Sequence, residues 1–166
     1  VVIWQTLAQT NSNTVMFDCT TAPGYGLEMG HIGGLEMAQG VWYDAENLNV
    51  QLQGSSTSPD RVYIDATAEG LQTLTVVGGS YEDQFYVGQT TDSSLSRIHG
   101  NLALNGGGGY QDKLYIDNAD DTTGWSDITL TSTGFTGMGL DGSITFAGFA
   151  WVTLTVGNGA DEVWLE

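Results

Sequence analysis

Four segments of the chain share one alternation of apolar and polar positions. Each starts with a run in which every second residue is apolar, passes through a turn-forming, mostly Gly-rich stretch to an aspartate, and ends in a second alternating run. The four aspartates are Asp60, Asp83, Asp112 and Asp161. Alternation with a period of two predicts half-buried β-strands, and glycine permits the positive φ angles of tight turns. We therefore expect each segment to fold as a strand, a turn and a second strand.

The residues that follow each aspartate repeat closely. The second and fourth are apolar in every segment: Val62 and Ile64, Phe85 and Val87, Leu114 and Ile116, Val163 and Leu165. The third is aromatic in every segment: Tyr63, Tyr86, Tyr115 and Trp164. Because successive side chains point to opposite faces of a strand, the apolar pairs should fill a core and the aromatic residues should point outward together. An outward aromatic row indicates a surface that packs against protein or stacks on sugar rings.

The spacing of the aspartates predicts the fold. Asp60 and Asp83 are 23 residues apart, Asp83 and Asp112 are 29 apart, and Asp161 follows after 49, which leaves room for one degenerate copy. A repeat of this length suits one coil of a parallel β-helix, with about three short strands and turns per coil. The sequence therefore predicts an all-β fold, a parallel β-helix or related β-solenoid with coils of about 23–29 residues.

The sequence also contains a second, longer repeat. Residues 1–65 resemble residues 114–166, at an offset of 113 that falls to 104 after an insertion near residues 29–38. The chain then reads as a single solenoid segment over 1–166, about one and a half modules, with 66–113 as the remainder of the module. Both ends fall within a motif. We expect covalent continuation of the array or end-to-end stacking of copies through apolar end residues, namely Val1, Val2, Ile3, Trp4, Val163 and Leu165.

Charge narrows the classes of partner. The 166 residues include 20 acidic and 3 basic side chains, a net charge of −17. Binding to nucleic acid or to an anionic membrane surface requires basic residues, and only Arg61, Arg97 and Lys113 are available. No segment is long and apolar enough for membrane insertion. The single cysteine, Cys19, is expected to be buried rather than reactive, and the acidic surface suits divalent cations or basic partners.

The Gly-rich turns carry a resemblance to a known family. The segments at 78–83, 106–112 and 157–161 resemble the Gly-Gly-x-Gly-x-Asp calcium-binding repeats of haemolysin-type (RTX) proteins, and the wider module is similar to the tandem repeats of large secreted proteins of that group. The resemblance implies secretion, an extracellular or cell-surface location, and calcium at Asp60, Asp83, Asp112 and Asp161. Each aspartate has a second interpretation, in which it caps its own turn by accepting backbone N–H groups. Because the motifs recur every 23 to 29 residues, we expect few calcium ions rather than a continuous row, and no other cofactor.

No catalytic residues are predicted. His31 and His99 have no neighbouring ligand pattern, and the three basic residues do not cluster in the sequence. We expect a structural extracellular repeat module, a rigid spacer or fibre-forming unit of a larger surface or filament protein. The alternatives are a calcium-dependent carbohydrate-binding adhesin module and a degenerate polysaccharide-degrading β-helix. The outer face of the aromatic row distinguishes them, because it would meet protein, sugar or a catalytic cleft respectively.

Overall fold

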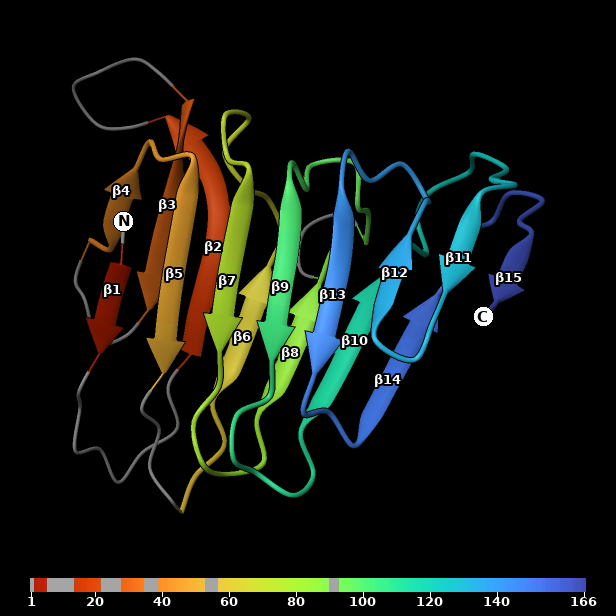
Figure 1. The fold of residues 1–166 in the computed structure, drawn as a ribbon. Coiled ribbons are helices and arrows are strands. Elements are labelled where there is room, and N and C mark those ends of the chain that lie inside the picture. Colours follow the sequence, from red (N-terminus) through yellow and green to blue (C-terminus); the bar gives the residue numbers. More distant parts are fainter. Residues whose placement is uncertain (1, 6–13, 22–27, 35–38, 53–56, 90–92) are drawn as a thin grey trace.

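A computed structural model describes residues 2–5, 14–21, 28–34, 39–52, 57–89 and 93–166. The regular structure in these residues consists of β-strands that form two sheets facing each other across a core (Figure 1). Within the described ranges no helix is long and apolar enough to cross a membrane. The prediction of an all-β chain is confirmed.

The first sheet has eight strands and mixed pairing. Its first five strands pair in parallel, the next two pairings are antiparallel, and the last is parallel. In spatial order the strands are β1 (Val2–Gln5), β5 (Asn47–Leu52), β7 (Thr73–Val77), β9 (Asn101–Asn105), β13 (Ser143–Ala147), β12 (Gly134–Thr136), β11 (Ile128–Leu130) and β15 (Val163–Leu165).

The second sheet has seven strands and is also mixed. Its first five strands pair in parallel, and the last two pairings are antiparallel. In spatial order the strands are β14 (Trp151–Thr155), β10 (Lys113–Asp117), β8 (Gln84–Val87), β6 (Arg61–Ile64), β2 (Thr14–Thr21), β3 (Glu28–Gly34) and β4 (Val41–Tyr43).

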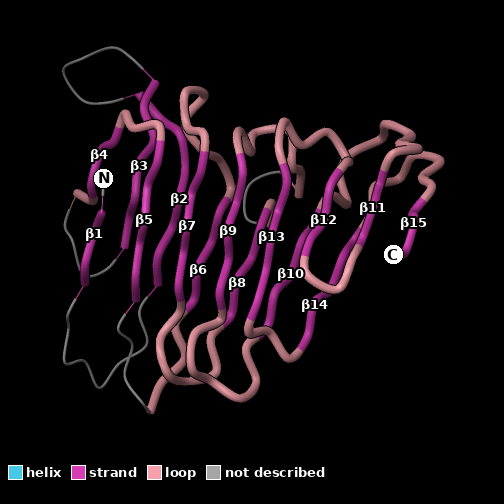
Figure 2. Tube along the Cα trace, viewed as in Figure 1, coloured by secondary structure: helices cyan, strands magenta, loops and turns pink. Residues whose placement is uncertain are grey.

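The prediction of a parallel β-helix or β-solenoid with coils of about 23–29 residues was wrong. Consecutive strands from β5 to β10 do alternate between the sheets (Figure 2). Both sheets, however, are open and contain antiparallel strands. Most of the region expected to be an insertion forms β3, which folds back on β2 and places Ile32 opposite Phe17 in the core. Around β12, Phe135 lies opposite Leu130 and Ile144. These antiparallel returns are stabilised by the burial of Ile32 and Phe135 in the core.

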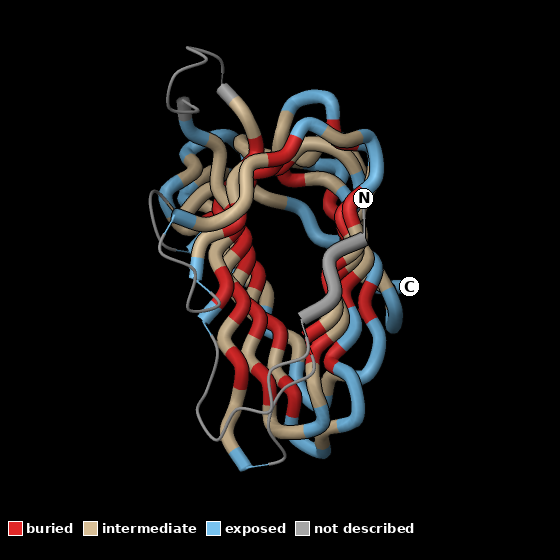
Figure 3. The backbone as a smooth tube through the Cα atoms, turned by 90° about the vertical axis from the view of Figure 1, so that its left-hand side faces the viewer, coloured by how far each residue is buried: buried red, intermediate tan, exposed pale blue. Residues whose placement is uncertain are grey.

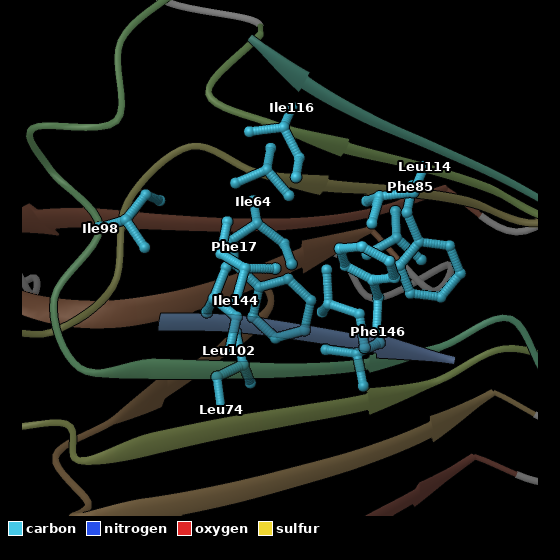
Figure 4. Close-up of a cluster of buried hydrophobic side chains, with 14 of the residues drawn as sticks. Phe17, Ile64, Leu74, Phe85, Ile98, Leu102, Leu114, Ile116, Ile144 and Phe146 are labelled. Carbon is cyan, nitrogen blue, oxygen red and sulfur yellow. The ribbon is translucent and has the colours of Figure 1, made fainter. Parts of the chain in front are cut away.

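Alternate residues of the strands fill the space between the sheets, as the buried positions along both inner faces indicate (Figure 3). The apolar pairs after the first three motif aspartates are fully buried: Val62, Ile64, Phe85, Val87, Leu114 and Ile116. They face apolar residues of the eight-stranded sheet, including Leu74, Leu102 and Ile144 (Figure 4). Each such side chain contributes about 1.5–3 kcal/mol by leaving water. The core rows therefore hold β6, β8 and β10 in one register.

Candidate functional site

Three of the four motif aspartates form a buried column beside the seven-stranded sheet. Asp60, Asp83 and Asp112 immediately precede β6, β8 and β10, and each is at most 1% exposed. The Oδ1 of Asp83 accepts the backbone N–H of Asp60 at 2.8 Å. The Oδ1 of Asp112 accepts the backbone N–H of Asp83 at 2.7 Å. The parallel register of the three strands creates the column, and each bond ties one turn to the next.

The glycines of the turns make room for these carboxylates. The N–H of Gly79 donates to Oδ2 of Asp83 at 2.6 Å. A Cβ atom on Gly78 would lie 2.7 Å from Oδ2 of Asp83, and one on Gly106 would lie 2.7 Å from Oδ2 of Asp112. Any larger residue would therefore push the carboxyl group out of the column. Both oxygens of Asp83 already accept N–H groups, which leaves fewer of its lone pairs for an ion.

Burial in the column raises the pKa of two of its carboxyl groups. Burial raises the pKa of Asp83 to about 7, the negative charges of Asp60 and Asp112 add to the increase, and the two N–H donors oppose it. Burial also raises the pKa of Asp112, with a further increase from the charge of Glu82. In the part of the chain that the structure describes, no group of three or more His, Cys, Asp or Glu side chains is arranged to hold a metal ion. Calcium binding at these aspartates stays a prediction.

The fourth aspartate lies elsewhere. Asp161 precedes β15 in the eight-stranded sheet, and its Oδ1 accepts the N–H of Trp125 at 3.0 Å. The position beside Asp112 belongs instead to Ala150, which precedes β14 and donates its N–H to the carbonyl oxygen of Asp112 at 2.9 Å. The sequence pattern predicted that Asp161 would lie with the other three aspartates. The pattern gives the spacing of the motifs along the chain, but it does not say which strand pairs with which.

Three of the four motif aromatics form a stacked row on the outer face of the seven-stranded sheet. The ring centroids of Tyr63 and Tyr86 are 4.8 Å apart with an interplanar angle of 10°, and those of Tyr86 and Tyr115 are 5.0 Å apart at 8°. The rings therefore cover one another, and Tyr86 has a neighbour on both faces. A sugar ring would find only the outer faces of Tyr63 and Tyr115. Trp164 lies apart on β15, where it is 55% exposed.

A second row of side chains runs beside the tyrosines, and the sequence analysis did not predict it. Arg61, Gln84, Lys113 and Trp151 are neighbours across β6, β8, β10 and β14. The ammonium group of Lys113 lies 5.6 Å from the ring centroid of Trp151, within cation–π range. The hydroxyl of Tyr86 donates to Oε1 of Gln84 at 2.8 Å. The available signal was the first residue after each aspartate, which is polar in all four motifs and basic in two.

The sheets end in incompletely covered apolar strands. On β15, Val163 is 39% exposed and Leu165 is 77% exposed, whereas the corresponding residues of the other motifs are buried. On β14, Val152 and Leu154 are half-buried, although the residues beside them on β10 are fully buried. Of the predicted N-terminal contacts, Val1 and the side chains of Val2, Ile3 and Trp4 lie outside the described residues, and the backbone of β1 pairs in parallel with β5.

Comparison with known family models, curated proteins and solved structures finds no match to this chain. Its function is therefore argued from the geometry of the molecule.

A small cavity of about 240 Å³ is lined by Cys19, Ala66, Thr67, Ala68, Glu69, Arg97 and His99. Cys19 is half-buried there rather than buried as expected. Nδ1 of His99 lies 2.7 Å from Oδ2 of Asp141, and Nδ1 of His31 lies 2.9 Å from Oδ1 of Asp18. Each histidine is thus held by one carboxylate.

Proposed function

We propose that this chain is a structural module of an extracellular assembly, and that modules add to one another through the sheet ends formed by β14 and β15. The observation that carries the proposal is the exposure of large apolar side chains on these two strands, namely Trp151 at 53%, Trp164 at 55% and Leu165 at 77%. Water-exposed apolar side chains gathered on strand edges are typical of surfaces that pair with another chain.

The occupant best suited to this end is another module of the same kind. Val152 and Leu154 on β14 lie in register with Leu114 and Ile116 on β10. The same two rows of apolar residues continue through β8 and β6 to β2. Each strand of this chain therefore covers the apolar residues of the strand before it. A further strand with the same alternation would cover Val152 and Leu154 and would satisfy the free backbone groups of the edge.

Stacking of the opposite end of one module on β14 and β15 of the next is a heterologous contact. Such a contact produces an open fibre when the rotation between copies does not close a ring. The two sheets, packed through one continuous core, would make each module a stiff segment. The extracellular setting rests on the resemblance of the Gly-rich turns to secreted haemolysin-type repeats.

Replacing Leu165 with Asp tests the proposal. We expect the wild-type chain to form particles whose mass grows steadily with concentration, and Leu165→Asp to show no such growth, because a buried unpaired charge opposes strand pairing. Light scattering across a concentration series measures the mass. Tyr110→Asp is the matched control, since Tyr110 is 94% exposed but lies in the turn before Asp112.

Growth should persist in the Tyr110→Asp protein. A wild-type chain that stays monomeric at high concentration would contradict the proposal, and so would equal growth of wild type and Leu165→Asp.

A further inference from the structure

We infer that the outer face of the seven-stranded sheet binds the same face of a second copy of this chain, through a two-fold axis parallel to the tyrosine row. This lateral contact is separate from the end-to-end contact proposed above and does not depend on it. The face is carried by β6, β8 and β10, which lie side by side at the centre of the sheet (Figure 1).

The basic and acidic residues on this face lie on opposite sides of the tyrosine row. One row holds Arg61 and Lys113, which are two of the three basic residues in a chain of net charge −17. The stacked tyrosines form the middle row. Two positions further along the strands come Asp117 on β10 and Asp18 on β2, on the same face as Tyr115 and Met16. The face is therefore basic on one side of the aromatic row and acidic on the other.

A face of this kind is complementary to itself. A two-fold axis that runs along the tyrosine row, midway between two facing sheets, exchanges the basic and acidic rows and lays tyrosine on tyrosine. Lys113 and Asp117 both lie on β10, four residues apart, so Lys113 of each copy comes opposite Asp117 of the other. An axis along the strands would instead place Arg61 opposite Lys113, which is repulsive. Charge thus selects one arrangement.

The rest of the molecule favours the same partner. An acidic chain is attracted to the few basic groups of another copy, and this face holds most of them. Facing sheets pack about 10 Å apart, and at physiological salt charges more than about 8 Å apart are largely screened, so the distant acidic groups interfere little. The patch is about 15 Å along the strands and about 20 Å across them, smaller than a permanent interface. We therefore expect weak, reversible dimers.

The test is a charge exchange on β10. It uses the Leu165→Asp background, in which end-to-end growth is blocked, and measures the dimer dissociation constant by sedimentation at physiological salt. We expect Lys113→Glu and Asp117→Lys each to weaken the dimer about tenfold or more, and the double variant to restore it to within about threefold. Arg97→Glu makes the same charge change away from this face and should leave the constant unchanged.

Circular dichroism of each variant checks that the fold is retained, and Asp117→Asn provides a milder variant because Oδ1 of Asp117 accepts the N–H of Ala119 at 3.0 Å. Three results would overturn the inference: no dimer at any concentration, equal dimerisation of all variants, or a double variant weaker than either single one. Absence of end-to-end growth in the wild-type chain, with the dimer of the Leu165→Asp protein intact, would count against the proposed function and leave this inference standing.

Discussion

Replacing Asp83 with asparagine tests whether the buried carboxyl column sets the pH dependence of stability. Asp83 is 1% exposed, and burial raises its pKa to about 7. Asparagine has nearly the same shape, and its Oδ1 can still accept the N–H of Asp60, but its amide nitrogen cannot accept the N–H of Gly79. We expect the variant to fold with the loss of one hydrogen bond, worth about 1 kcal/mol.

The sign of the effect follows from proton binding. An exposed aspartate has a pKa of 3.8, so between 3.8 and about 7 the folded state holds a proton that the unfolded state has released. The free energy of unfolding therefore falls as pH rises through this window, by about 1.4 kcal/mol for each pH unit. Between pH 5 and pH 8 the contribution of Asp83 falls by about 2.7 kcal/mol. Asp112, whose pKa is also raised, contributes in the same direction in both proteins.

Urea unfolding followed by tryptophan fluorescence at pH 5 and pH 8 measures these free energies. Wild type should lose about 2.7 kcal/mol more than Asp83→Asn between the two pH values. Asp127→Asn, a change at an exposed carboxylate, should behave as wild type does. If wild type and Asp83→Asn lost the same free energy, the column would not be a buried proton-binding group and the reasoning would fail.

Two further predictions concern the core and the aspartates. Leu104→Ala should lower the free energy of unfolding by about 2–5 kcal/mol in a urea titration, because Leu104 is 2% exposed, whereas Tyr115→Ala on the outer face should cost less. A neutral result for Leu104→Ala would contradict this assignment of the faces. Calorimetric titration of metal-free protein with calcium should show little heat and a small rise in melting temperature, since both oxygens of Asp83 and Oδ1 of Asp112 accept backbone N–H groups. Four or more bound ions would contradict this.

Local alternation was enough to predict the central strands. The residues at the second and fourth positions after Asp60, Asp83 and Asp112 are all buried, and the third positions form one row. These features depend on the two-residue period of a strand, which is visible in a sequence.

The overall pairing was not predictable in the same way. Strand β3 pairs antiparallel with β2, and β15 joins β11 rather than β14, so Asp161 and Trp164 leave the rows that their motif predicts. Which edge a strand joins depends on the edges available to it and on the length of chain that returns, and neither is encoded in the alternation itself. The separation of basic and acidic residues on the outer face was not predictable either. It depends on which strands lie beside β10, with its Lys113 and Asp117.

The hydrogen bonds between turns and strands also bear on how the chain reaches this fold. Those that join Asp60 to Asp83, Asp83 to Asp112 and Leu102 to Thr145 close loops of 23, 29 and 43 residues. Contacts so distant in sequence form slowly, because the entropy of closing each loop is lost before any burial repays it. The antiparallel returns are more local: β2 and β3 pair Thr21 with Glu28, 7 residues apart, and β11 and β12 pair Leu130 with Phe135, 5 residues apart. Folding should therefore start at these hairpins, and the parallel pairings should form more slowly.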